Sequence, residues 1–235
     1  MNIKDKKYNF NIKQHRDVLV SLLREIAQSQ KDKFILKGGT ALMYSYKLDR
    51  FSEDIDFDAR TNISLEGCIK QFCSKRNYEY RKAKETDTVH RFFIHYHGDK
   101  PLKIEISYRD INIEEEYYTK INDIYVYTID SLCMLKTIAY TSRDKIRDLY
   151  DICFIVEKYW DTLSKPVKLL LKKSFINKGF EQFDYLMLTQ KDDLLSTDIL
   201  EDRFLKLYEK LELLPDEKNY RMRYKYNLNI TPNDI

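Results

Sequence analysis

Apolar and polar positions follow a helical spacing near the start of the chain. Between residues 11 and 30, apolar side chains recur three and four positions apart with polar residues between them: Val18, Leu19, Leu22, Leu23 and Ile26. This spacing predicts an amphipathic helix that packs one face on a sheet. The segments that follow predict a strand, a helix, a second strand and another short helix, over residues 33–37, 40–47, 55–59 and 65–76.

The pattern changes to a period of two between residues 78 and 107. Strands are predicted over residues 78–82, 90–97 and 102–107, with a turn at residues 98–101. In the last strand one face is apolar, and the other carries Lys103, Glu105 and Ser107. Glu105 is therefore a candidate for chemistry on the polar face. The alternative is that this face is the exposed side of an edge strand.

Helical spacing returns after residue 127 and continues over most of the remaining chain. Thr128 or Asp130 is expected to cap one helix and Ser142 the next, and Pro166 to open a third. Further helices are predicted over residues 181–189 and 198–214. The change of class predicts an α+β fold, with a mixed sheet flanked by helices in a domain of residues 1–127 and a helical bundle in a domain of residues 128–235. No repeat or low-complexity linker separates the two, so they are expected to share an interface.

Composition narrows the class of protein. The 235 residues are 43% hydrophobic and 34% charged, as expected of a soluble, ordered chain. A net charge of +3 creates no overall basic field, so a nucleic-acid partner would have to contact local patches. No stretch approaches the roughly 18 apolar residues of a membrane span, and the N-terminus lacks the apolar core of a signal peptide. A cytoplasmic location without membrane contact is expected.

The tyrosines, cysteines and histidines indicate no site of their own. The 19 tyrosines are expected mainly to pack, with their hydroxyls at the rim. The four cysteines lack metal-ligand spacing and are expected to be reduced and buried: Cys68, Cys73, Cys133 and Cys153. His95 and His97 share a predicted strand face and could bind a metal, although a solvated face is the preferred interpretation.

Candidate chemistry concentrates in residues 34–57, FILKGGTALMYSYKLDRFSEDIDF. Gly38 and Gly39, two of the five glycines in the chain, lie between a predicted strand and a predicted helix. At such a place the backbone cradles a phosphate or simply turns. Asp54 and Asp56 lie two positions apart, so in a strand their carboxylates share one face while Ile55 points into the core. Hard oxygen ligands at this spacing suit Mg²⁺ that carries substrate phosphates.

These residues and three further motifs resemble a known family. The segment GGTAL at residues 38–42 and the R-x-S-x-D-I-D-F pattern at residues 50–57 resemble the first motif of the AbiEii/AbiGii-type nucleotidyltransferases. These are toxin components of bacterial toxin–antitoxin and phage-defence systems within the DNA polymerase β-like superfamily. Glu105 in K-I-E-I resembles the third acid, Lys136 the lysine of the third motif, and R-D-L-Y-D at residues 147–151 the fourth motif. The resemblance spans about residues 33–157.

The resemblance implies a polymerase β-like fold that transfers a nucleotide from an NTP. It assigns catalysis to Asp54, Asp56, Glu105, Lys136 and Asp148. It assigns nucleotide binding to Gly38, Gly39, Thr40, Arg50 and Ser52. Mg²⁺, or alternatively Mn²⁺, is expected on the three acids Asp54, Asp56 and Glu105.

The resemblance also implies individual roles. Arg50 is expected to fix its loop by pairing with a carboxylate or a phosphate, and Ser52 to touch a phosphate. Lys136 is expected to neutralise charge that develops on the phosphates, and Asp148 to position that lysine or the acceptor. Many superfamily members carry G-S where this chain has G-G-T, so backbone amides are favoured over the Thr40 hydroxyl as the phosphate contact.

Several alternatives stay open from the sequence. Lys136 and Asp148 lie on predicted amphipathic helices, where charged side chains are usually just solvated. The fold could also serve an inactive module that only binds nucleotide, RNA or a partner protein, or a phosphotransferase. The expected partners are an NTP, an RNA such as tRNA or a protein as acceptor, and a cognate antitoxin. The tail KNYRMRYKY at residues 218–226 could contact RNA or be a solvated tail.

Overall fold

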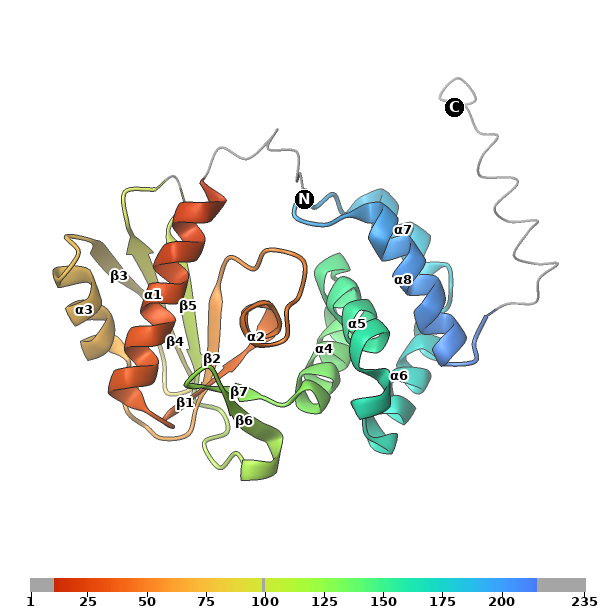
Figure 1. The fold of residues 1–235 in the computed structure, drawn as a ribbon, viewed down its shortest axis with the longest axis horizontal. Helices are drawn as coiled ribbons and strands as arrows, with labels where there is room; N and C mark the ends of the chain where they lie inside the picture. The colour runs from red at the N-terminus through yellow and green to blue at the C-terminus, as the bar shows by residue number, and fades with distance from the viewer. Residues whose placement is uncertain (1–10, 99, 215–235) are drawn as a thin grey trace, which may run out of the picture.

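The first predicted helix forms as α1 (Ile12–Gln30) in the computed structural model, which describes residues 11–98 and 100–214. Its N-cap residue Asn11 accepts a hydrogen bond from the backbone N–H of Gln14 at 3.1 Å. The predicted apolar stripe of α1 is buried. With α3 (Glu66–Ser74), this helix covers one face of a sheet (Figure 1).

Within the described residues, the strands form one mixed sheet of seven strands in the order β3-β4-β5-β2-β1-β7-β6. The strands are β1 (Phe34–Lys37), β2 (Ile55–Ala59), β3 (Glu79–Glu85), β4 (Val89–His95), β5 (Leu102–Ser107), β6 (Tyr118–Ile121) and β7 (Ile124–Tyr127). Strand β2 is antiparallel to β1 and parallel to β5. The sequence analysis did not predict β6, β7 or the short 3₁₀ helix η1 (Glu115–Tyr117); the many charges of residues 109–121 obscure the pattern there.

The two faces of the central strands differ as the alternation predicts. In β2 and β5, Ile55, Phe57 and Ile104 are fully or almost fully buried in the core. Asp56 and Glu105 occupy the opposite face and are register partners on the two parallel strands. Because successive side chains point to opposite sides of a sheet, the core contacts of the apolar residues fix the direction of these carboxylates.

The described chain after residue 127 is helical apart from its connections. It contains α4 (Ile129–Arg143), α5 (Ile146–Tyr159), η2 (Trp160–Thr162), α6 (Lys165–Lys178), α7 (Gln182–Thr189) and α8 (Thr197–Lys210). Thr128 caps α4, since its side chain accepts a hydrogen bond from the backbone N–H of Ser131. The prediction that Ser142 caps the next helix is wrong. Helix α4 continues until Asp144 adopts a left-handed conformation with φ 45°, and the Ser142 hydroxyl donates to the Ala139 carbonyl.

Aromatic and thiol side chains fill the interior of the helical part. Tyr140 stacks on Phe175 with ring centroids 5.5 Å apart, and Phe204 stacks on Phe183 at 4.3 Å. Tyr140 and Tyr208 are buried, in agreement with the prediction that tyrosines pack. All four cysteines are free and buried, as predicted. No helix in the described ranges is long and apolar enough to cross a lipid bilayer.

A polar interface joins the sheet to the helices. Helix α2 (Gly38–Ser45) follows β1 directly, and the segment after it, residues 46–54, returns to β2. This segment meets the helical part through Asp49, which accepts from Arg203 of α8 at 2.7 Å, and through Arg50, which donates to α5. Tyr46 lies between the hydroxyl of Tyr159 and the carbonyl of Tyr127. The loop that carries the predicted site is thus tied to both parts of the chain.

Candidate active site

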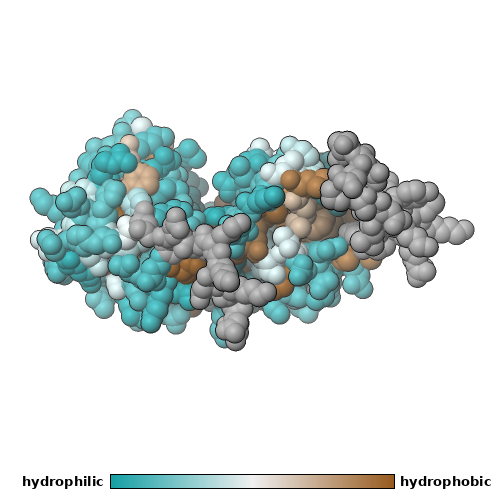
Figure 2. Space-filling view, turned by 90° about the horizontal axis from the view of Figure 1, so that it is seen from above, coloured by the Kyte–Doolittle hydropathy of each residue, from teal (hydrophilic) through white to brown (hydrophobic). Residues whose placement is uncertain are grey.

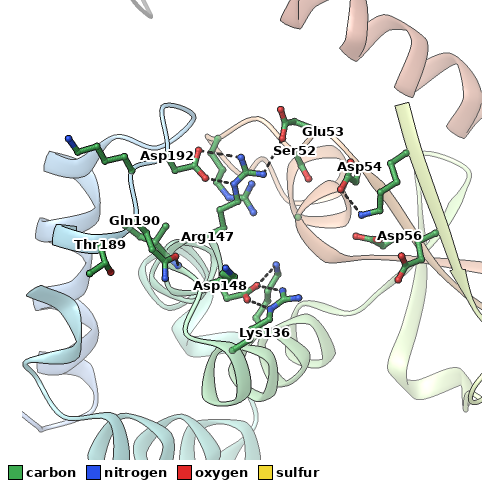
Figure 3. A pocket seen from close by; sticks show the side chains of 18 residues that line it. Ser52, Glu53, Asp54, Asp56, Lys136, Arg147, Asp148, Thr189, Gln190 and Asp192 are labelled. Atoms are coloured by element: carbon green, nitrogen blue, oxygen red, sulfur yellow. Dashed lines mark hydrogen bonds and ion pairs between the residues drawn. The ribbon is translucent and has the colours of Figure 1, made fainter. Parts of the chain in front are cut away.

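A cleft of about 660 Å³ lies between the sheet and the helices, and the notch between the two parts is visible in the space-filling view (Figure 2). Eight of the residues predicted from the sequence line it: Gly39, Arg50, Ser52, Asp54, Asp56, Glu105, Lys136 and Asp148. Gly38 and Thr40 are not among the residues that line it. The cleft therefore brings together residues from positions 39 to 148, which the sequence places far apart (Figure 3).

The sheet side of the cleft carries the three predicted acids, which we call the acid wall: Asp54, Asp56 and Glu105. Asp56 and Glu105 are paired in register, and Asp54 immediately precedes β2. Desolvation raises the pKa of Asp56, and the negative charges of the other two acids add to this effect. The wall thus concentrates negative charge at one end of the cleft.

Two cations from neighbouring strands contact the acid wall. Lys103 donates from Nζ to Asp54 Oδ2 at 2.8 Å, and Arg91 donates from Nε to Glu105 Oε2 at 2.8 Å. Lys103 precedes Glu105 by two positions in β5, so both lie on the same face of the sheet. The K-I-E-I alternation already placed Lys103 on that face, although the sequence indicated no role for it.

The two glycines at the start of α2 are required by close contacts inside the protein. Gly38 has φ +74°, and a Cβ atom there would lie 3.0 Å from Asp56 Oδ2. A Cβ atom on Gly39 would lie 2.8 Å from the Ser52 hydroxyl oxygen. The Thr40 side chain is buried; its hydroxyl donates to the Asp54 carbonyl and lies 3.0 Å from Ser52 Oγ. Thr40 therefore holds the segment that carries Asp54 and does not reach the cleft with its hydroxyl.

The helical side of the cleft is built on a buried charge network. Arg50 donates from Nε and Nη2 to the two carboxylate oxygens of Asp151, each at 2.7 Å. Lys136 of α4 contacts Asp151 at 2.7 Å and Asp148 at 3.0 Å. Arg143 donates to both oxygens of Asp148, at 2.7 and 2.9 Å. Three cations thus share two carboxylates, and the network carries one surplus positive charge.

The carboxylates of this network are held ionised by their partners. Burial alone would raise the pKa of Asp151, but the guanidinium of Arg50 and the ammonium of Lys136 outweigh burial, so this pKa is lowered. The pKa of Asp148 is lowered in the same way against burial, chiefly by Arg143. The predicted pairing of Arg50 with a carboxylate is confirmed, and its partner is Asp151.

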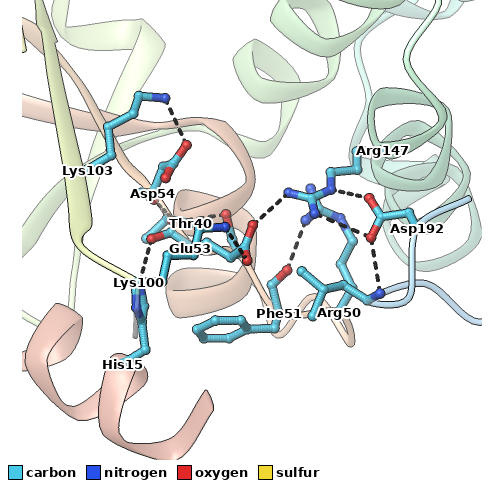
Figure 4. Close-up of polar contacts among 12 residues, drawn as sticks. His15, Thr40, Arg50, Phe51, Glu53, Asp54, Lys100, Lys103, Arg147 and Asp192 are labelled. Carbon is cyan, nitrogen blue, oxygen red and sulfur yellow. Dashed lines mark hydrogen bonds and ion pairs between the residues drawn. The ribbon is translucent and has the colours of Figure 1, made fainter. Parts of the chain in front are cut away.

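A second polar network links α1, the loop before β2 and the helical part (Figure 4). Glu53 accepts from Lys100 at 2.7 Å and from Arg147 of α5 at 3.2 Å. Arg147 also donates to Asp192, in the connection between α7 and α8. The Glu53 backbone carbonyl accepts from Nε2 of His15 at 2.8 Å. This carbonyl belongs to the residue before Asp54, so α1 and the helical part both fix the start of β2.

Several residues of the site were assigned no role from the sequence. Asp151 was visible as the last residue of R-D-L-Y-D, three positions from Asp148 and hence on the same side of α5. Arg143 is the last residue of α4, and Lys145 lies in the connection between α4 and α5. Asp192 and its neighbours at residues 189–191 reach the cleft only because the helices fold back on it. Nothing in their local pattern distinguishes them from an ordinary polar loop.

The acids on the sheet fit a divalent cation by their chemistry, although they are not drawn together as a closed ligand set. Across the described residues, no group of three or more His, Cys, Asp and Glu side chains stands ready to hold a metal ion. The charges of Asp54 and Glu105 nevertheless raise the pKa of Asp56, in addition to the larger effect of desolvation. A divalent cation would relieve this repulsion, and carboxylate oxygens are the ligands that Mg²⁺ prefers.

Solved structures share this fold along nearly the whole chain. The crystal structure of JHP933 from Helicobacter pylori is 28% identical, with a TM-score of 0.73 over 93% of this chain and 98% of that chain. A putative nucleotidyltransferase from H. pylori is also 28% identical, with a TM-score of 0.72 over 86% of this chain and 93% of its own. The nucleotidyltransferase toxin MenT4, Rv2826c of Mycobacterium tuberculosis H37Rv, is 16% identical and shares the fold, with a TM-score of 0.53 over 92% and 91% of the two chains.

A family match extends the likeness to the sequence itself. None of the curated protein sequences is significantly similar to this chain. The family described as "Nucleotidyl transferase AbiEii toxin, Type IV TA system" matches residues 21–225, which include the acid wall, the buried charge network and the loop at residues 189–192. From this match and from the fold, the chain belongs to the AbiEii family of nucleotidyltransferase toxins.

Proposed function

We propose that the protein transfers a nucleoside monophosphate from an NTP to an acceptor hydroxyl in this cleft. The observation that carries the proposal is the opposition of charge across one cavity. The acid wall lies on the sheet side. Five cations of the helical side line the same space, and three of them are here called the basic wall: Lys136, Arg143 and Lys145. A metal–triphosphate complex has the matching distribution, with a cation at one end and phosphate oxygens at the other.

In this proposal the acid wall holds one or two Mg²⁺ ions, with Mn²⁺ as the alternative. The metal would lower the pKa of the attacking hydroxyl and stabilise the pyrophosphate leaving group. Asp54 and Asp56 would provide the ligands from the start of β2, and Glu105 from the neighbouring strand. The contacts of Ile55 and Ile104 with the core would keep these carboxylates directed at the cleft.

The basic wall would bind the phosphates. Arg143 has a side chain that is 57% exposed and uses two of its donors on Asp148, which leaves further guanidinium N–H groups for phosphate oxygens. Lys136 is almost buried and shares Asp148 and Asp151, so we assign it to charge that develops in the transition state. Asp148 would position both cations. Gly38 and Gly39 would bring the first backbone amides of α2 to the triphosphate.

The proposal assigns the two walls to the two parts of the chain. Residues 1–127 would form the nucleotidyltransferase domain, which carries the metal, and residues 128–235 the helical domain, which carries the phosphate-binding cations. The contacts of Asp49, Arg50 and Glu53 with α5 and α8 support this assignment, because they hold the acid wall and the basic wall on opposite sides of the cleft.

Labelled nucleotides test the reaction directly. The protein is incubated with Mg²⁺ and each NTP, labelled at either the α- or the γ-phosphate, in the presence of a cell extract that contains acceptors. Nucleotidyl transfer predicts that label from the α-phosphate enters a macromolecule, and that Asp56→Asn abolishes this incorporation while the variant stays folded. Transfer from the γ-position alone would identify a phosphotransferase, and transfer from neither position a binding module.

The acceptor and the biological role are the least constrained part of the proposal. We propose an RNA acceptor, such as the 3′ end of a tRNA, and a cognate antitoxin partner, because the family is one of toxins. Expression of the wild type should then arrest growth, and Asp54→Asn should relieve the arrest. RNase treatment of the α-labelled product should release the label, whereas protease-sensitive label would identify a protein acceptor.

The RNA-binding surface can be located by substitution. The basic, aromatic tail at residues 218–226 lies outside the described residues. Replacing its four basic residues should weaken RNA binding and reduce the salt dependence of the affinity, because fewer counterions are released on binding. If that variant binds RNA unchanged while Lys145→Ala and Lys191→Ala in the cleft weaken binding, the acceptor lies between the two walls instead.

A further inference from the structure

Lys103 lies on the sheet next to the carboxylates of the acid wall. The register of the parallel strands pairs Ile55 with Ile104 and Asp56 with Glu105. The same register sets Lys103 beside Asp54, one position before the first of these pairs. The Lys103 ammonium lies 2.8 Å from Asp54 Oδ2, and its charge also interacts with Asp56 and Glu105. Lys103 is therefore the direct counterion of Asp54, while Arg91 pairs with Glu105.

This contact lies inside the cleft and differs from an ordinary surface ion pair. Lys103 and Asp54 both line the cavity, with side chains only 28% and 38% exposed. Other cations that contact this loop, such as Lys100 on Glu53, pair with carboxylates that are not assigned to a metal. Lys103 instead neutralises an oxygen that the proposed function assigns to the metal. An ammonium and a divalent cation repel each other strongly when both contact the same carboxylate.

We propose that Lys103 is a positioning residue that holds Asp54 in the metal-free protein and leaves it when a metal–nucleotide complex enters. The inference rests on the proposed function. Without nucleotide, Lys103 would oppose metal binding, because the ion must displace the ammonium from Asp54. With nucleotide, the phosphates supply new acceptors for the displaced ammonium. Lys103 would thus couple metal binding to nucleotide binding and keep the empty site from holding a metal ion alone.

Binding of Mn²⁺ to the nucleotide-free protein tests this role without turnover. The free-ion signal in electron paramagnetic resonance is followed during titration of the wild type and of Lys103→Met. The variant should bind Mn²⁺ at least about ten-fold more tightly, because the competing charge is gone. Adding a non-hydrolysable α,β-methylene NTP should tighten Mn²⁺ binding more in the wild type than in the variant, and so reduce the difference.

A charge-matched control separates the local effect from a change of net charge. Lys100→Met also removes one positive charge, next to Glu53, but leaves Asp54 and its partner untouched. Its affinity for Mn²⁺ should stay within about two-fold of the wild type. Lys103→Gln serves as a second variant should the methionine perturb folding, which thermal unfolding would reveal. Equal or weaker binding of Mn²⁺ in folded Lys103 variants would overturn the inference.

The same titration tells the two proposals apart. Asp56→Asn is placed in the wild type and in the Lys103→Met background. If Asp56→Asn weakens Mn²⁺ binding in both but Lys103→Met does not tighten it, only the role of Lys103 fails. If Asp56→Asn leaves Mn²⁺ binding unchanged in both, the acid wall is not the metal site, and the role of Lys103 fails with it.

Discussion

The buried carboxylate of Asp151 is expected to be the most sensitive position of the buried charge network. It is fully buried and accepts two hydrogen bonds of 2.7 Å from Arg50 and one contact of 2.7 Å from Lys136. In Asp151→Asn, the side-chain NH₂ would face a donor, and two cations would lose a buried counterion. Removal of one partner from such a network costs about 3–5 kcal/mol, a large part of the roughly 5–15 kcal/mol that stabilises a domain.

Equilibrium unfolding in urea measures this loss. The midpoint for Asp151→Asn should fall while the slope m stays unchanged, because the folded state buries the same surface. Lys206→Ala is the matched control, since it removes a 2.9 Å contact with Glu157 from a side chain that is 55% exposed and should cost no more than about 1 kcal/mol. A loss for Asp151→Asn no larger than that of the control would refute the claim that this network fixes Arg50 and its loop.

Two further predictions concern single side chains of the site. Burial lowers the pKa of His15 in the folded protein, against the opposing effect of its bond to the Glu53 carbonyl. In the unfolded chain this histidine has a pKa of about 6.5, so near and just below that pH the unfolded chain binds more protons than the folded one. Stability should therefore fall as the pH drops through this range, and urea midpoints at about pH 7.5 and 5.5 should differ more for the wild type than for His15→Gln; equal differences would contradict this. Lys136→Ala should lower kcat by an amount equivalent to about 3 kcal/mol in the barrier while fluorescence titration shows nearly unchanged NTP affinity. Lost affinity with unchanged kcat would make Lys136 a ground-state binding residue.

Local patterns were sufficient to predict the sheet face that carries the acids. The alternation in residues 55–59 and 102–107 predicted both strands at their observed bounds and placed Asp56 and Glu105 on the polar face. The helical stripe of α1 was predicted for the same reason, since burial of one face imposes a period that can be read directly. These elements owe their form to short-range spacing, and tertiary contacts did not override it.

Other features depend on contacts between distant residues and could not be predicted. Ser142 looked like a helix cap because it precedes an apolar run, but α4 ends only where Asp144 adopts a left-handed conformation. Asp151 was visible as an acid on a predicted amphipathic helix, but its pairing with Arg50, 101 positions away, was not. The family resemblance assigned Thr40 to nucleotide binding, whereas in the structure its hydroxyl holds the Asp54 backbone. Pairing across such distances leaves no periodic trace in the sequence.

The positions of bound metal and nucleotide are the sharpest test of the proposed function. Crystals grown with Mn²⁺ and an α,β-methylene NTP would be measured for anomalous scattering at the manganese edge. An anomalous peak coordinated by Asp54 and Asp56 is expected, with the triphosphate directed at Arg143 and Lys136. A nucleotide in the separate cavity beside Arg24, Tyr44 and Lys120, or a manganese peak away from the acid wall, would contradict the proposed function.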